Sequence, residues 1–106
     1  MKIIDTILEG VKVIEPTILK DERGEFSRIF CDNELEEIVG KKKIIQINRS
    51  KTRKIGAIRG MHYQNAPHSE IKIVRCLGGK VFDVAVDLRK DSPALYRALG
   101  ETSLSS

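Results

Sequence analysis

Alternation of polar and apolar residues dominates the chain from residue 43 onward. The stretches "KIIQINRS", "GAIRGMHYQ" and "SEIKIVRCLGG" each show this alternation, which predicts β-strands. Gly78-Gly79 predicts a hairpin turn that leads into a further strand, "KVFDVAVDLR". The tail "YRALGETSLSS" loses the periodicity, so we predict no strand for it.

The N-terminal part of the chain adds one strand and the one convincing helix. "VKVIEP" predicts a strand that ends at Pro16, because proline has no N–H to donate inside a ladder. "CDNELEEIVGK" predicts a short helix over residues 33–39, with Asn33 as its N-cap and Gly40 at its C-terminus.

Short strands separated by turn signals, with a single short helix, indicate an all-β sandwich or barrel. The length of 106 residues leaves room for one domain, residues 1–106. Five or six strands are visible, which is an incomplete set for a sandwich. We therefore expect unpaired strand edges, completed either by another chain or by a longer one.

Hydropathy and cysteine usage bear on location. No apolar run approaches the roughly 20 residues of a membrane span, so we expect a soluble chain that makes no membrane contact. The N-terminus, "MKIIDTILEG", carries acidic residues early and lacks the cleavage site of a signal peptide, which favours the cytoplasm. Cys31 and Cys76 are isolated, and we expect reduced, buried thiols.

The net charge of +4 is mild, but basic residues concentrate in "RSKTRK", residues 49–54, beside "KKK" at 41–43. This stretch is interpreted either as a solvated loop or as a surface for phosphates, on a nucleotide or on nucleic acid. Aromatic residues for base stacking are sparse there, and no helix-turn-helix or zinc-finger pattern is present. We expect no nucleic-acid partner.

His62 is the first candidate for chemistry. A lone histidine in an apolar strand is often a satisfied core residue. Alternation, however, places His62 on the same strand face as Gly60 and Gln64, and in a barrel such a polar face can line a pocket. A neutral imidazole there is suited to act as a general base.

Lys72 is the second candidate, either as a solvent-facing lysine or as the cation that stabilises an enolate oxygen in a pocket. Gln46 and Asn48 share one face of their strand and suit sugar hydroxyls or a carbonyl. Arg23 and Arg59 can hold phosphate oxygens through the planar guanidinium.

A metal site is the rival interpretation of the histidines. His62 and His68 lie six positions apart across a turn that contains Pro67. Tight sites usually draw three or four ligands, and no further histidine follows on a later strand. We therefore expect no bound metal.

Taken together, "DERGEFSRIF", "QINRSKT", "GAIRGMHYQ" and "PHSEIKIVRCLGGKVFDVAVDLRKDSP" resemble the N-terminal part of the dTDP-4-dehydrorhamnose 3,5-epimerase family. The resemblance covers nearly the whole chain and implies a cupin (jelly-roll) fold. It also implies epimerisation of dTDP-4-dehydro-6-deoxy-D-glucose at C3 and C5, a step toward dTDP-L-rhamnose for surface polysaccharide. The resemblance implies no metal or organic cofactor.

The resemblance also implies roles for individual residues. His62 matches the base that removes the proton beside the C4 ketone, and Lys72 matches the lysine that stabilises the enolate. The substrate-binding positions that it implies are Arg23, Phe26, Gln46, Asn48 and Arg59. In the family the segment around Arg23 and Phe26 reaches into the neighbouring subunit's site, so a homodimer is expected.

Two departures from the family pattern bear on activity. Arg28 and Ile47 stand where many members carry acidic residues, which points to a sub-branch. The chain is also expected to be truncated at its C-terminal side, without the family's acid tyrosine and its histidine-pairing aspartate. The alternatives are a sugar-nucleotide 3-epimerase, a 3,4-ketoisomerase and an inactive nucleotide-sugar-binding module.

Overall fold

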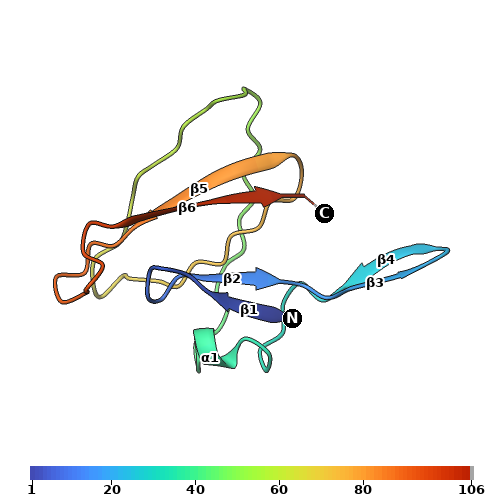
Figure 1. The fold of residues 1–106 in the computed structure, drawn as a ribbon, viewed down its shortest axis with the longest axis horizontal. Coiled ribbons are helices and arrows are strands. Elements are labelled where there is room, and N and C mark those ends of the chain that lie inside the picture. Colours follow the sequence, from blue (N-terminus) through green and yellow to red (C-terminus); the bar gives the residue numbers. More distant parts are fainter. Residues whose placement is uncertain (106) are drawn as a thin grey trace.

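The computed structural model of the chain describes residues 1–105, which form an all-β structure with one short helix (Figure 1). Three antiparallel hairpins, β1–β2, β3–β4 and β5–β6, each make a separate two-stranded sheet. The elements are β1 (Lys2–Asp5), β2 (Lys12–Glu15), β3 (Ile18–Asp21), β4 (Gly24–Ser27), α1 (Glu36–Val39), β5 (Lys80–Val86) and β6 (Ala98–Leu104). The prediction of an all-β chain is confirmed.

The first two hairpins follow from local sequence. β2 ends at Glu15, directly before Pro16, as predicted, and it pairs with β1 in the register Ile3↔Ile14. β3 and β4 are joined by a tight turn that closes at Gly24, whose φ of +141° is open to glycine and strained for other residues. Figure 1 shows β3–β4 as an arm that projects away from the other hairpins.

The helix is shorter than the predicted 33–39, and its predicted N-cap is wrong. α1 begins after Leu35, which takes the N-cap position and has no polar side chain to cap the helix; the Leu35 N–H donates to the Cys31 carbonyl at 3.0 Å. Leu35 is almost completely buried, so its packing fixes where the helix begins. Gly40 closes the helix as predicted, with its N–H on the Glu36 carbonyl. No helix in residues 1–105 is long and apolar enough to cross a membrane.

Two strand predictions for the C-terminal half are wrong. The Gly78-Gly79 turn does not pair β5 with residues 70–77; the partner of β5 is β6, which lies in the tail for which no strand was predicted. Gly100 breaks the pattern of the tail for a packing reason, since a Cβ there would lie 2.4 Å from the ring of Phe82. The apolar alternation that marks a strand is therefore interrupted at Gly100, where the Phe82 ring occupies the space that a side chain would take.

The segment 43–77 is extended but contains no strand, although three strands were predicted within it. The physical reason is that no neighbouring strand among residues 1–105 pairs with it. Its apolar side chains remain exposed, Ile45 at 89%, Ile47 at 84% and Ile58 at 94%. Alternation of polar and apolar residues thus predicts an apolar face that can be buried, whereas a β-strand also needs a neighbouring strand to accept and donate its backbone hydrogen bonds.

This openness is visible in the dimensions of the whole chain. The accessible surface is 9664 Å², whereas a folded monomer of this mass exposes about 6,000 Å². The radius of gyration is 15.5 Å, against about 13 Å for a compact domain of this length. The buried apolar side chains in the described part of the chain are Leu8, Leu35, Cys76 and Ala94. The unpaired edges expected from the sequence are present.

Both cysteines are free thiols, as predicted, but only Cys76 is buried. Its Sγ lies 3.5 Å from the Gly79 carbonyl oxygen, to which the thiol donates a weak hydrogen bond. Cys31 is half-buried.

A second polar link ties the N-terminus to the segment before α1. The Glu34 carboxylate accepts from the Met1 ammonium at 2.6 Å and from Arg28 Nη1 at 2.8 Å. These two hydrogen bonds lower the pKa of Glu34 to about 2. Arg28 therefore has a structural partner in Glu34.

Asp87 organises the link between the first and last hairpins. Its carboxylate is buried, and it accepts from the Arg89 backbone N–H and Nε, both at 3.0 Å, from Arg89 Nη2 at 2.8 Å and from the Ser92 hydroxyl. Arg89 Nη2 also donates to the Glu9 carbonyl at 2.7 Å, across 80 residues of sequence. We call Asp87, Arg89, Ser92 and the Glu9 carbonyl the Asp87 cluster. The Arg89 and Ser92 hydrogen bonds hold the pKa of Asp87 far below its ordinary value.

Asp87→Asn keeps the side-chain shape but removes the charge, so we expect Tm at pH 7 to fall by about 5 °C or more. A carboxyl with a depressed folded pKa stabilises only while it is ionised. The difference from the wild type should therefore shrink as the pH falls below about 4, the ordinary pKa of aspartate. Thermal unfolding followed by circular dichroism at several pH values measures both effects.

Asp91→Asn is the matched control, because Asp91 lies exposed near the same turn and makes no hydrogen bond with the described residues. We expect its Tm within about 2 °C of the wild type. Equal losses for the two variants would contradict a structural role for the Asp87 cluster.

Candidate functional site

The residues predicted to form the site fall on two separate parts of the structure. Arg23 and Phe26 lie on the β3–β4 arm. The other five lie on the extended segment 43–77: Gln46, Asn48, Arg59, His62 and Lys72. In residues 1–105, no hydrogen bond or ion pair joins the arm to His62 or Lys72.

On the arm, Arg23 is held by its neighbour Asp21. Arg23 Nη2 lies 2.6 Å from Asp21 Oδ2, and the Arg23 backbone N–H donates to Oδ1 at 2.8 Å. The side-chain hydrogen bonds raise the pKa of Arg23 and lower the pKa of Asp21. The pair is exposed, so it contributes little to stability, and the guanidinium can leave it for another anion at small cost.

Phe26 presents an apolar surface beside this arginine. It is 68% exposed and lies opposite Leu19, which is 62% exposed, in the β3–β4 register. The arm side chains line a shallow hollow of about 490 Å³ that includes both Arg23 and Phe26. An aromatic ring next to an exposed guanidinium suits a base or sugar joined to a phosphate.

His62 is exposed and makes no hydrogen bond with any described residue. Its imidazole folds back toward Gly60, where a Cβ would lie 3.6 Å from His62 Nδ1. Gly60 has a φ of +112°, a conformation that favours glycine, whereas the ring itself would leave room for a Cβ. An imidazole that is accessible and unpaired is available to accept a proton.

Lys72 and Gln64 meet at a residue that sequence reasoning missed, Glu70. Lys72 Nζ lies 3.4 Å from Glu70 Oε1. With its amide nitrogen turned toward the same oxygen, Gln64 donates to Glu70 at 2.8 Å and to the His68 carbonyl at 3.3 Å. Glu70 thereby links the strand-like run that carries His62 to the run that carries Lys72. The two-residue spacing from Glu70 to Lys72 was the available signal, because it puts both on one face.

Arg59 is connected to the basic loop, since its Nη2 donates to the Thr52 hydroxyl at 3.3 Å. Gln46 and Asn48 are exposed, two positions apart on the extended segment. The structure thus brings Lys72, Glu70 and Gln64 together, and it brings Arg59 to the loop at 49–54. Among the described residues, no hydrogen bond or ion pair joins Gln46, Asn48 or the arm to either group.

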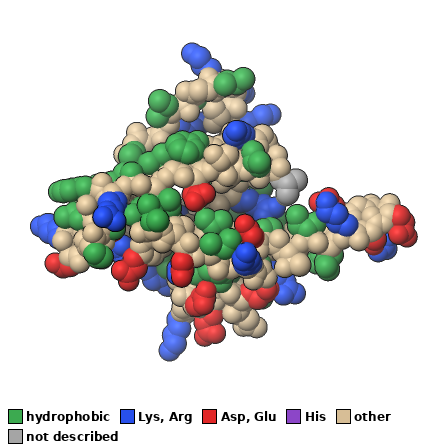
Figure 2. Space-filling model, in the orientation of Figure 1, with side chains coloured by type: hydrophobic (Ala, Val, Ile, Leu, Met, Phe, Trp, Pro, Cys, Tyr) green, Lys and Arg blue, Asp and Glu red, His purple; other side chains and the backbone are tan. Residues whose placement is uncertain are grey.

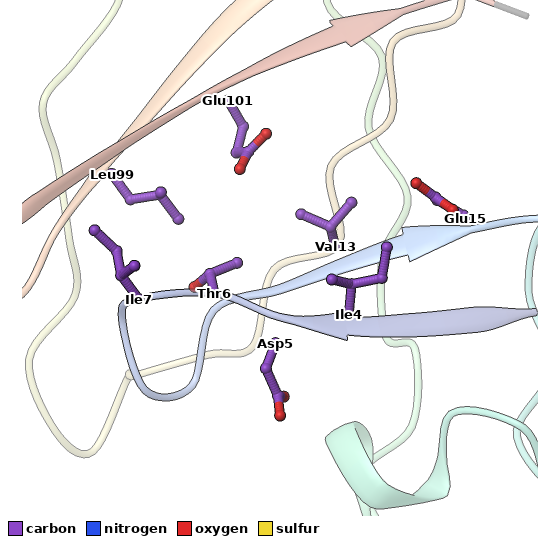
Figure 3. A pocket seen from close by; sticks show the side chains of 8 residues that line it. All are labelled: Ile4, Asp5, Thr6, Ile7, Val13, Glu15, Leu99 and Glu101. Carbon is purple, nitrogen blue, oxygen red and sulfur yellow. The ribbon is translucent and has the colours of Figure 1, made fainter.

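A different hollow lies between the first and last hairpins (Figure 3). Its volume is about 470 Å³, and its lining residues are Ile4, Asp5, Thr6, Ile7, Val13, Glu15, Leu99 and Glu101. Figure 3 shows Leu99 and Glu101 descending from β6 toward Val13 and Thr6. The lining contains three carboxylates and none of the predicted site residues, so this hollow is unsuited to a phosphorylated ligand.

The two histidines do not form part of a metal-binding cluster. Within the described residues, no three side chains of His, Cys, Asp or Glu lie close enough together to hold a metal ion.

Comparison with known proteins gives the family. The model of the dTDP-4-dehydrorhamnose 3,5-epimerase family matches residues 5–106. The enzyme of that name from Shigella flexneri is 46% identical over 101 residues, which are 94% of this chain and 55% of the relative. The one from Salmonella typhimurium is 41% identical over 101 residues, with the same coverage. The chain spans about half the length of these relatives.

Solved structures agree over nearly the whole chain. The crystal structure of dTDP-4-dehydrorhamnose 3,5-epimerase from Elizabethkingia anophelis matches with a TM-score of 0.91 and 39% identity, over 99% of this chain and 57% of that one. A Legionella pneumophila 3,5-epimerase in complex with dTDP-4-keto-L-rhamnose matches with a TM-score of 0.85 and 40% identity, over 97% of this chain and 54% of that one.

Coverage of 99% means that the extended segment 43–77 follows the path of the corresponding segment in a solved epimerase. The cupin, or jelly-roll, fold predicted through the resemblance is confirmed by these structures. A family model that matches residues 5–106, together with relatives more than 40% identical, leaves one conclusion. The chain belongs to the dTDP-4-dehydrorhamnose 3,5-epimerase family.

Proposed function

We propose that this chain carries the proton-abstraction site of an isomerase, a sugar-nucleotide 3,5-epimerase. Its substrate is dTDP-4-dehydro-6-deoxy-D-glucose, inverted at C3 and C5 to dTDP-4-dehydro-L-rhamnose for surface polysaccharide synthesis in the cytoplasm. The observation that carries the proposal is the 46% identity, over 101 residues, to a relative named for this reaction. The Legionella relative bound to dTDP-4-keto-L-rhamnose supports the substrate class.

The chemistry starts from the C4 ketone, which acidifies the protons on C3 and C5. The exposed His62 imidazole takes one of these protons, and the electron pair of the broken C–H bond moves to the C4 oxygen. The resulting enolate oxygen is stabilised by the Lys72 ammonium. Return of a proton to the same face leaves the sugar unchanged, whereas return to the opposite face from a second acid completes the inversion.

Lys72 is prepared for this role by Glu70. The carboxylate 3.4 Å away keeps the ammonium close to the run that carries His62, and the pair is half-exposed. Such an ion pair is weak, so a developing enolate can replace Glu70 as the partner of Lys72. The fixed positive charge then meets the negative charge that appears only as the proton leaves.

Substrate binding falls to the remaining predicted residues. Arg59 and Arg23 hold the diphosphate, and Phe26 packs on the nucleotide. Gln46 and Asn48 hydrogen-bond the sugar. The guanidinium of Arg23 exchanges its exposed partner Asp21 for phosphate oxygens.

Exchange of the C3 and C5 protons with solvent and inversion of these carbons need different sets of residues. A measurement of exchange therefore distinguishes the 3,5-epimerase from a 3-epimerase and from a binding module. Deuterium incorporation from heavy water requires only the base and the enolate stabiliser. We expect this chain to exchange the C3 and C5 protons of the dTDP-4-keto sugar, as followed by mass spectrometry and NMR. Incorporation at C3 alone indicates a 3-epimerase, and dTDP binding without any exchange indicates a binding module. Absence of both binding and exchange contradicts the proposal.

His62→Ala should reduce deuterium incorporation by at least about 100-fold, because it removes the base. His68→Ala is the matched control: it is exposed, lies in the adjoining loop and has no proposed part in the chemistry. Full exchange by His62→Ala would remove that residue from the mechanism.

Lys72→Met should slow exchange by about 100-fold or more, while the affinity for dTDP changes less than threefold. The charge acts on the enolate, which forms only after the nucleotide is bound. Lys80→Met, an exposed lysine at the start of β5, controls for the loss of one positive charge. A loss of dTDP affinity equal to the loss of exchange would contradict the proposed role of Lys72.

We also propose that the active form is a homodimer in which the β3–β4 arm packs on the second copy. The support is the arm's exposed apolar surface at Leu19 and Phe26 and its projection from the other hairpins (Figure 1). Light scattering after gel filtration should give twice the chain mass, and Phe26→Ser should shift the population toward monomer. A wild-type chain that stays monomeric at high concentration contradicts this assembly.

A further inference from the structure

Charge is distributed very unevenly along this chain. Residues 38–69 contain eight of the nineteen Lys and Arg residues and no Asp or Glu. The rest of the chain holds the other eleven cations and all fifteen carboxylates, a net charge of −4. The mild overall charge of +4 therefore hides a segment of +8, which we call the acid-free segment.

Most of the positive charges of this segment form no ion pair with the described residues. In the part of the chain that the structure describes, only Lys43 among the eight forms an ion pair, with Asp32 at 2.7 Å. The cations of the arm and of the turn after β5 behave differently, since Lys20, Arg23 and Arg89 are each paired with a carboxylate. Figure 2 shows Lys and Arg side chains around the protruding loop with no acidic side chain beside them.

The loop in the middle of this segment is positioned next to a proposed diphosphate ligand. The hydrogen bond from Arg59 to the Thr52 hydroxyl, at 3.3 Å, brings Arg59 to the run that holds Lys51, Arg53 and Lys54. The chain reverses direction between Lys54 and Arg59. In this turn the Ala57 N–H donates to the Lys54 carbonyl, and Gly56 has a φ of +78°. All three cations are exposed. They therefore adjoin Thr52, the residue that Arg59 contacts, without being part of the predicted substrate set.

We infer that Lys51, Arg53 and Lys54 form a cationic collar that draws the diphosphate of the sugar nucleotide toward Arg59 before it binds. This inference rests on the proposed function for the identity of its ligand. Exposed charges of one sign without ion-pair partners raise the local concentration of an anion and its association rate, and salt screens this effect. The acid-free segment also lacks aromatic residues before Tyr63, so it has no platform for stacked bases. A diphosphate suits it better than a single-stranded nucleic acid does.

The test compares two triple variants of equal net charge in the full chain. The collar variant is Lys51→Gln, Arg53→Gln and Lys54→Gln. The control variant is Lys2→Gln, Lys80→Gln and Lys90→Gln, three exposed lysines outside the acid-free segment. Stopped-flow binding of dTDP and of pyrophosphate at several salt concentrations gives the association and dissociation rates of each.

We expect the collar variant to associate about tenfold more slowly at low salt, with its dissociation rate within twofold of the wild type. The difference should vanish near 1 M salt, where the Debye length is about 3 Å. The control variant should keep the wild-type rates. Equal slowing in both variants, or none in the collar variant, overturns the inference, as does failure of the wild type to bind either probe.

Two further outcomes distinguish the collar from a nucleic-acid-binding segment and from the epimerase proposal. Tighter binding of a single-stranded oligonucleotide than of dTDP, lost in the collar variant, would overturn the inference and assign the segment to nucleic acid. Pyrophosphate association that depends on the collar, in a chain that exchanges no sugar protons, supports the collar and refutes the epimerase proposal.

Discussion

Extended backbone needs partners for its N–H and C=O groups, and this requirement decides how the whole chain is arranged. The hairpins β1–β2, β3–β4 and β5–β6 meet it internally, each with its own antiparallel ladder. The segment 43–77 does not, because no strand within residues 1–105 lies beside it. The large accessible surface and the exposed isoleucines follow directly from that difference. Where a ladder exists the chain is ordinary β-structure; where it does not, the chain still follows the backbone path of a solved epimerase.

The proposed chemistry depends on the same constraint. His62 and Lys72 lie on the unpaired segment, and the contacts that join their two runs pass through Glu70. The Asp87 cluster ties the connection that follows β5 to the turn of the first hairpin. It provides no strand partner for the segment before β5. In the proposed mechanism, proton exchange with solvent requires only this base and this cation. Inversion also requires a second acid on the opposite face of the sugar, and hence further residues around the substrate to position it.

Sequence patterns predicted the parts of the fold that depend on neighbours in the chain. The strand before Pro16, the end of the helix at Gly40 and the all-β class all follow from local rules, and they are confirmed. The N-cap at Asn33 was wrong because burial of Leu35, a tertiary effect, sets the start of α1. β6 was missed because Gly100 makes room for an aromatic ring on the facing strand. Among site residues, the family resemblance supplied the roles, whereas Glu70 became visible only when its distances to Lys72 and Gln64 were known.

Hydrogen exchange of the backbone amides tests most directly the claim that the site residues lie on unpaired extended backbone. The measurement uses the free chain at a concentration where it is monomeric, with mass spectrometry of peptides that cover residues 44–77 and the β5–β6 hairpin. Amides of β5 and β6 should exchange at least about 100-fold more slowly than those of residues 44–77, because only the hairpin has a ladder. Protection of residues 44–77 equal to that of β5 would contradict the account.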